Sequence, residues 1–267
     1  MGILNVTPDS FSDGGRFDAP ERAVAHALEM IDAGAAIIDI GGESTRPGAA
    51  DVSEEEEIRR VVPIIAALAK STNVPISIDT SKPAVMRAAL DAGASLINDV
   101  RALREPGALA IAAASDAAIC LMHMQGEPRS MQHDPRYEDV VREVREFLSA
   151  RMHACVAAGI ATDRLVLDPG IGFGKRLQHN LDLLANLPAL LELERPLLIG
   201  VSRKSMFGTL LNRQVHERLA GGLAVATAAV LAGASIVRTH DVAETVDAVK
   251  VAAALCAAGY RGGHHES

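Results

Sequence analysis

Short apolar runs that end in an acidic or amide residue recur along this chain and limit the folds open to it. One run, at residues 165–168, ends in Asp168 and is followed by Pro169, which cannot continue a strand ladder. The same pattern closes four other runs, at Asn5, Asp39, Asp79 and Asn98. A single Asp after a strand is usually a turn or cap residue, but the repetition predicts strands that all end at one site.

Eight apolar runs alternate with segments of helical periodicity. The predicted strands are residues 2–7, 36–42, 75–80, 95–100, 118–123, 165–170, 197–202 and 234–240. In a chain of 267 residues this order favours an α/β fold, the (β/α)8 TIM barrel, as one domain over residues 1–267. A doubly wound open sheet is the alternative, because the number of strands does not by itself close a sheet.

Local signals mark the ends of the helices. Ser53 with Glu56, and Asp241 with Glu244, have the spacing of a capping box that starts a helix. Four Ala-Gly pairs precede predicted strands, and a glycine in this place is typical of the left-handed residue that ends a helix. These glycines are Gly34, Gly93, Gly159 and Gly233.

Composition argues against several classes of function. Apolar residues make up 49% of the chain with no Trp, which suits parallel strands covered by Ala-rich helices. The formal net charge of -8 argues against non-specific nucleic-acid binding, although a few basic residues in one cleft can still attract an anion. No run reaches the roughly 18 apolar residues of a membrane span. Cys120, Cys155 and Cys256 are widely spaced, which predicts reduced packing residues in a cytoplasmic protein.

Three acceptor-rich residues form the first chemical group at the strand ends: Asp79, Asn98 and Asp168. In a TIM barrel the carboxyl ends of all strands meet on one face, so these residues are expected to converge. A carboxylate accepts two parallel N–H donors, as the edge of an amino-substituted ring offers. The group therefore suggests a nitrogen heterocycle as ligand.

Basic residues on the last strand form the second group. Arg238 and His240 project to the same side of their strand because side chains alternate with a period of two, and they lie where TIM barrels often bind phosphate. With Asn5 and Thr45 they suggest a site for a phosphate or another oxyanion. The alternative is that Arg238 forms an ion pair with one of the strand-end Asp residues.

Lys204 follows the seventh predicted strand and admits two roles. A lowered pKa would let Lys204 form a Schiff base, as in class I aldolases, whereas an ammonium would donate a hydrogen bond. The glycines at positions 170, 172 and 174 match neither the P-loop, which needs Gly at Pro169, nor the dinucleotide fingerprint, which needs Gly at Lys175.

Longer motifs connect these residues. They occupy residues 2–15, 39–48, 79–82, 97–99, 121–124, 168–170, 202–205 and 238–240. In this order, and over the whole chain, they resemble dihydropteroate synthase of bacterial folate synthesis. The resemblance implies a transferase and sulfonamide target in which p-aminobenzoate displaces diphosphate from 6-hydroxymethyl-7,8-dihydropterin diphosphate to give 7,8-dihydropteroate.

The resemblance also implies roles for individual residues. The catalytic residues would be Asp79, Asp168 and Lys204. The pterin would contact Asp79, Asn98, Met122, Asp168, Phe173, Gly200 and Lys204. The diphosphate would contact Asn5, Thr45, Arg238 and His240. The p-aminobenzoate would contact Thr45, Arg46, Pro47, Phe173 and Ser202.

Further expectations follow from the same family. They are Mg²⁺ held at Asn5, a homodimer in the cytoplasm, and a short segment before the first strand, whereas Gly2 already belongs to that strand here. Two alternatives remain. A pterin-binding methyltransferase on the same barrel would be expected to lack both residues 45–47 and the pair Arg238 and His240. A non-catalytic pterin-binding paralogue would be expected to have lost Lys204 or residues 9–15.

Overall fold

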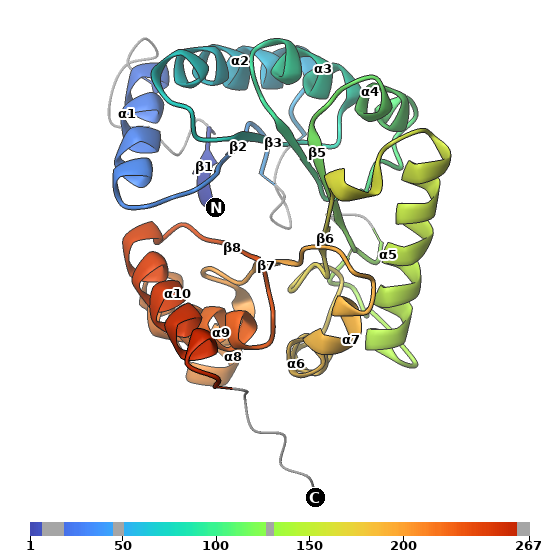
Figure 1. The fold of residues 1–267 in the computed structure, drawn as a ribbon, viewed down its shortest axis with the longest axis vertical. Helices are drawn as coiled ribbons and strands as arrows, with labels where there is room; N and C mark the ends of the chain where they lie inside the picture. Colours follow the sequence, from blue (N-terminus) through green and yellow to red (C-terminus); the bar gives the residue numbers. More distant parts are fainter. Residues whose placement is uncertain (7–18, 45–50, 127–130, 261–267) are drawn as a thin grey trace, which may run out of the picture.

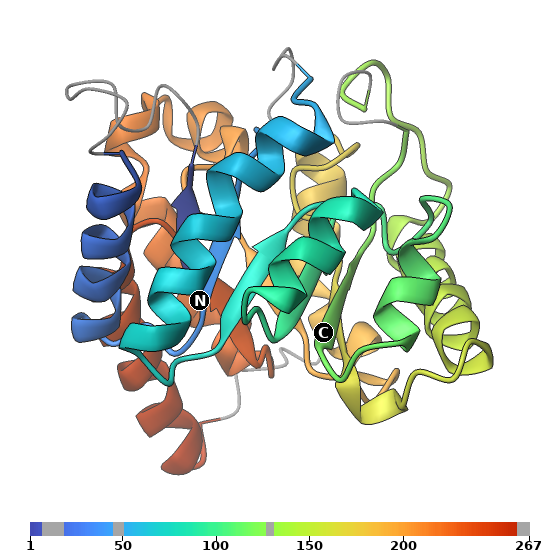
Figure 2. The ribbon, with the colours of Figure 1, turned by 90° about the horizontal axis from the view of Figure 1, so that it is seen from above.

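In the computed structural model, parallel strands form a ring that is enclosed by helices (Figures 1 and 2). The structure describes residues 1–6, 19–44, 51–126 and 131–260. Within these ranges the strands are β1 (Gly2–Asn5), β2 (Ile38–Gly41), β3 (Ile76–Asp79), β4 (Leu96–Asp99), β5 (Ala118–Met122), β6 (Leu165–Asp168), β7 (Leu198–Gly200) and β8 (Ile236–Arg238). The predicted TIM barrel is therefore confirmed, with each strand somewhat shorter than its predicted range.

The strands follow one another around the ring in chain order. Strands β1 to β6 form one parallel sheet, and β7 pairs with β8. Single bridges join the two sheets, between Gly2 and Thr239 on one side and between Leu167 and Leu197 on the other. These bridges close the barrel, which excludes the open doubly wound sheet.

Helices cover the outside of the ring (Figure 1). They are α1 (Ala19–Asp32), α2 (Glu54–Ser71), α3 (Pro83–Asp91), α4 (Ala108–Ala113), α5 (Val140–Ala157), α6 (Leu177–Ala185), α7 (Leu187–Leu191), α8 (Ser205–Leu211), α9 (Leu219–Leu231) and α10 (Val242–Ala257). None of these helices, which lie in the described part of the chain, is long and apolar enough to cross a membrane.

The predicted helix ends are largely confirmed. All four glycines of the Ala-Gly pairs have positive φ, between 91° and 114°, as a left-handed helix end requires. The Ser53 Oγ accepts a hydrogen bond from the Glu56 N–H at 3.2 Å and caps α2. The helix start predicted at Asp241 is confirmed, because α10 begins at Val242 with Asp241 as its N-cap residue. The capping-box bond is wrong, because the Asp241 carboxylate makes no side-chain cap bond with α10 and accepts a hydrogen bond from the Arg203 guanidinium at 2.5 Å instead.

The cysteines agree only in part with their predicted packing role. All three are free thiols. Cys120 and Cys155 are buried, but Cys256 is exposed near the end of α10, so the packing role is wrong for Cys256.

Apolar side chains fill the inside of the barrel at its amino-terminal end. Leu96, Cys120, Val166 and Leu198 form one buried cluster, and Ile236 packs against it. Since side chains alternate along a strand, the residue two positions later projects to the same inner side. The inner positions above this cluster are therefore Asn98, Met122, Asp168, Gly200 and Arg238, each at or next to the carboxyl end of its strand.

Candidate active site

A network of ion pairs and one hydrogen bond joins Arg238 to Asp39 and Asp79, and Asn98 to Asp39. The Arg238 guanidinium donates through Nε to Asp39 Oδ2 at 2.6 Å and through Nη2 to Asp79 Oδ2 at 2.7 Å. The Asn98 amide donates through Nδ2 to Asp39 Oδ2 at 3.0 Å. The ion pair considered as the alternative for Arg238 is therefore present, and the structure brings Asp79, Asn98 and Arg238 together around Asp39.

Asp39 is the deepest member of this network. Its side chain is fully buried, and it lies on β2 two residues before Gly41, which pairs with Asp79 across the sheet. Asp39 thus lies one layer below the strand ends, where it supports Arg238 and Asn98 from beneath. The sequence marked Asp39 only as one more strand-end acid, because its partners lie 59 and 199 residues away.

Burial sets the electrostatics of these groups. It raises the pKa of Asp79 to about 7, with Arg238 opposing the shift and Asp39 adding to it. Burial disfavours the charged form of Arg238, but Asp39 and Asp79 outweigh this effect and raise the pKa of Arg238 above its ordinary value. Burial, followed by the charges of Asp168 and Asp39, raises the pKa of the Cys120 thiol. The Asp168 and Asp39 carboxylates therefore both act on the Cys120 thiol inside the barrel.

Asp168 ends β6 and is 6% exposed. Its Oδ1 accepts a hydrogen bond from the Gly170 N–H at 2.7 Å, and its backbone carbonyl accepts one from the His123 N–H at 2.9 Å. Burial raises the pKa of the Asp168 carboxyl, whereas the Gly170 bond and the nearby Lys204 lower it. The Gly170 N–H, in the loop that follows Asp168, thus fixes the orientation of the Asp168 carboxylate.

Lys204 lies over the ring of Phe173, with Nζ 4.0 Å from the ring centroid. Burial lowers the pKa of Lys204 to about 8, although Asp168 opposes the shift. Phe173 in turn packs against a buried cluster of Val100, Met122, Met124 and Met131. Lys204, Phe173 and Met122 therefore form one wall beside Asp168.

The remaining predicted residues are placed unequally. Ser202 and His240 lie together, because the Ser202 Oγ is 3.0 Å from His240 Nδ1 and accepts a hydrogen bond from the His240 N–H at 3.2 Å. Gly200 pairs with Arg238 across β7 and β8. Asn5 lies half-buried at the end of β1. The predicted contacts at Thr45, Arg46 and Pro47 fall outside the described residues.

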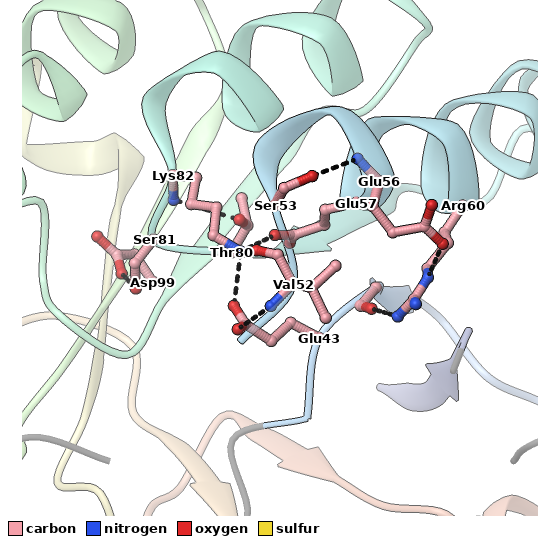
Figure 3. Close-up of polar contacts among 11 residues, drawn as sticks. Glu43, Val52, Ser53, Glu56, Glu57, Arg60, Thr80, Ser81, Lys82 and Asp99 are labelled. Atoms are coloured by element: carbon pink, nitrogen blue, oxygen red, sulfur yellow. Dashed lines mark hydrogen bonds and ion pairs between the residues drawn. The ribbon is translucent and has the colours of Figure 1, made fainter. Parts of the chain in front are cut away.

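A second polar network, which sequence reasoning missed, surrounds Lys82 (Figure 3). The Lys82 ammonium donates to Glu43 Oε2 at 2.7 Å, to the Val52 carbonyl at 2.7 Å and to Glu57 Oε2 at 2.6 Å. The Val52 N–H donates to Glu43 Oε1 at 3.1 Å. Lys82 therefore ties both chain segments that flank residues 45–50 to α2, and it lies three residues after Asp79. The only sequence signal was its place in the motif at residues 79–82.

Asn5 is the residue on which Mg²⁺ was expected. No group of three or more His, Cys, Asp or Glu side chains among the described residues could hold a metal ion. Asn5 offers an amide oxygen at the carboxyl end of β1, in register with Gly41 and, one strand further, with Asp79. Mg²⁺ accepts such a site, because it usually keeps several waters and takes substrate phosphate oxygens as ligands. Asn5 therefore offers one oxygen donor of the kind that Mg²⁺ takes.

Comparison with known proteins agrees with this geometry. The family model described as pterin binding enzyme matches residues 1–240. The chain is 55% identical to dihydropteroate synthase of Escherichia coli strain K12, over 97% of this chain and 92% of the relative.

Solved structures agree as well. The Xanthomonas albilineans dihydropteroate synthase with 4-aminobenzoic acid is 52% identical, with a TM-score of 0.91 over 96% of this chain and 92% of that one. The same enzyme in complex with 7,8-dihydropteroate is 50% identical, with a TM-score of 0.88 over 96% and 93%.

The fold and the strand-end residues define a pterin-binding enzyme, as the family model over residues 1–240 also indicates. At this identity and coverage the chain belongs to the dihydropteroate synthase family. Members of this family are transferases that condense 6-hydroxymethyl-7,8-dihydropterin diphosphate with p-aminobenzoate to give 7,8-dihydropteroate and diphosphate.

Proposed function

We propose that Asp168 and Asn98 hold the edge of the pterin, with Asp79 beside them and Lys204 donating from the opposite side. The observation that carries this assignment is the orientation of Asn98. Its Nδ2 donates to Asp39, so in the described part of the chain Oδ1 remains as an acceptor for a ring N–H. Met122, Phe173 and Gly200 pack around the ring. In this arrangement Lys204 acts as an ammonium donor and not as a Schiff-base lysine.

The diphosphate is bound by Arg238 and His240 on β8 and just after it, and by Asn5 and Thr45. The negative charge is matched by Arg238, whose raised pKa keeps the guanidinium charged. Mg²⁺ at Asn5 would neutralise part of the charge that develops on the departing diphosphate. The amine is held by Thr45, Arg46, Pro47, Phe173 and Ser202.

The reaction follows a dissociative route. A neutral aromatic amine is a modest nucleophile, so the C–O bond to diphosphate breaks first and a pterin-stabilised cation forms. Asp79 stabilises this cation as a carboxylate. Exclusion of water protects the cation, since water competes with the amine.

Two measurements test the function and the route. Protein, Mg²⁺, pterin diphosphate and labelled p-aminobenzoate should yield labelled 7,8-dihydropteroate, and no labelled product would contradict the function, leaving a methyltransferase or a silent paralogue. Positional isotope exchange in pterin diphosphate, with ¹⁸O in the oxygen that joins carbon to phosphorus, tests the route. Exchange without p-aminobenzoate is expected, and exchange only when the amine is present would contradict a dissociative route.

The same proposal includes a homodimer in the cytoplasm. Most of the large exposed apolar side chains of the described residues lie on or next to α8 and α10: Leu210, Leu211, Val215, Val251, Leu255 and Tyr260. A partner subunit would cover exposed apolar surface of this kind on α10. The three free thiols support a reducing compartment.

Sedimentation tests the dimer. Val251→Glu, on α10 at 60% exposure, should shift the protein towards monomer. The control Val156→Glu, on α5 at 46% exposure, should leave the sedimentation coefficient unchanged. Equal sedimentation of both variants and the wild type would contradict the interface.

A further inference from the structure

Lys175 is a buried lysine next to the site that has no part in the reaction proposed above. It is 3% exposed and ends the loop that follows β6. Its Nζ lies 2.9 Å from His123 Nδ1, 3.0 Å from the Gly170 carbonyl and 3.0 Å from the Phe173 carbonyl, with a longer contact of 3.4 Å to the His123 carbonyl. Burial lowers the pKa of Lys175 to about 7, with Asp168 opposing the shift. The charged form has three donors and no acceptor, so the three near acceptors use all of its N–H groups.

His123 is matched to this ammonium. For Lys175 to donate, Nδ1 of His123 must be an acceptor, which requires a neutral imidazole. Burial, together with the charge of Lys175, lowers the pKa of His123 to about 2. The ring is also held edge-on against Phe147, with centroids 4.9 Å apart and planes at 88°. Lys175 therefore connects the end of β5 to the loop after β6.

The loop itself is pressed against the end of β5. Gly170, Gly172 and Gly174 all have positive φ. A Cβ on Gly170 would lie 1.9 Å from the His123 carbonyl oxygen, so this position accepts only glycine. These glycines let the loop backbone lie close to the end of β5, but they have no side chains that could hold the loop in shape. Lys175 supplies that missing restraint, because it binds two carbonyls of the loop at once.

The loop shape determines one wall of the site. The Phe173 carbonyl is one of the groups that Lys175 binds, and the Phe173 ring lies under Lys204 Nζ. A Cβ on Gly172 would lie 3.1 Å from Lys204 Cδ, so the loop backbone also supports the Lys204 stem. A displaced loop would move Phe173 and Lys204 together.

We propose that Lys175 is a positioning residue: its ammonium holds the loop after β6 in the shape that keeps Phe173 against Lys204 before the substrate binds. The functional part of this inference rests on the proposed contact of Phe173 and Lys204 with the pterin. Preorganisation of this kind strengthens binding, because the loop need not be ordered when the ligand arrives.

Hydrogen exchange of the ligand-free protein tests the positioning without any substrate. Lys175→Met should speed exchange at the Gly172 and Phe173 amides at least tenfold, because their bonds to Asn180 Oδ1 and to the Gly170 carbonyl depend on the loop shape. The control Lys70→Met removes an exposed lysine from α2 and should leave these amides unchanged. Equal exchange in Lys175→Met and in the control would overturn the proposal.

Calorimetry tests the effect on ligands. Lys175→Met should weaken binding of 6-hydroxymethylpterin about tenfold and leave binding of inorganic diphosphate within twofold. Equal losses for both ligands would overturn the role of Lys175 in pterin binding.

If Lys175→Met does not fold, Lys175→Arg serves instead, because it keeps the charge but not the tetrahedral geometry. It should weaken pterin binding more than diphosphate binding, with a smaller loss than Lys175→Met. Wild-type exchange and affinity in this variant would overturn the proposal. A wild type that does not bind the pterin would contradict the proposed function, while the exchange experiment would still decide the role of Lys175.

Discussion

Lys82→Met should destabilise the barrel strongly, because it leaves a buried carboxylate without its partner. The Glu57 side chain is fully buried and its Oε2 accepts from Lys82 Nζ at 2.6 Å, while 23% of the Lys82 side chain is exposed. Removal of one partner from a buried ion pair costs roughly 3–5 kcal/mol. Since Lys82 itself is partly hydrated, we expect about 3 kcal/mol, at the lower end of this range. That loss corresponds to a decrease in Tm of roughly 6–12 °C for a domain of this size.

Thermal unfolding at pH 7, followed by circular dichroism, measures this change. The matched control is Arg59→Met, which removes a 73% exposed partner of Glu56 on the same helix and should change stability by less than about 1 kcal/mol. The double variant Lys82→Met/Glu57→Gln also removes the unpaired carboxylate of Glu57, and it should recover at least half of the decrease in Tm. Equal Tm values for Lys82→Met and Arg59→Met would refute the reasoning, as would a double variant no more stable than Lys82→Met.

Three further predictions concern the substrates. Asp168→Asn should weaken binding of 6-hydroxymethylpterin by roughly 10- to 150-fold in calorimetry, because a charge-assisted hydrogen bond contributes about 1.5–3 kcal/mol; a change of less than threefold would show that Asp168 does not hold the ring. Arg238→Ala should weaken binding of diphosphate far more than binding of the pterin alcohol, and equal losses would remove Arg238 from the anion site. The rate constant kcat/KM for pterin diphosphate should fall below about pH 7, where Asp79 gains a proton, and above about pH 8, where Lys204 loses one; a flat profile from pH 6 to pH 9 would contradict both assignments.

The strands and their order were predictable because they depend on local patterns. Apolar runs with a polar terminus specify where each strand ends, and the two-residue period specifies which side chains enter the barrel. Asp79, Asn98 and Asp168 were found in this way. The Ala-Gly helix ends were equally local, since a positive φ at Gly93 or Gly233 depends only on the adjacent backbone.

The choice of partner among competing charges was not predictable. Asp241 had the spacing of a cap, but Arg203 binds its carboxylate. Lys82 was part of a recognised motif, yet its partners come from three places: Glu43 after β2, Val52 before α2, and Glu57 in α2. Which donor meets which acceptor depends on distances across the barrel, and a single sequence does not contain them.

Arg238 shows why both interpretations of one residue can be correct. The sequence left open an ion pair with a strand-end Asp or a site for an anion. The ion pair uses one N–H on Nε and one on Nη2, towards Asp39 and Asp79. A guanidinium has five N–H donors, so three have no partner among the described residues and could bind an oxyanion. Asp39 therefore fixes the plane of the guanidinium while the rest of its fork can receive diphosphate. Because Asp39 also binds Asn98, one buried carboxylate orients both the group that we propose for the pterin and the group that we propose for the diphosphate.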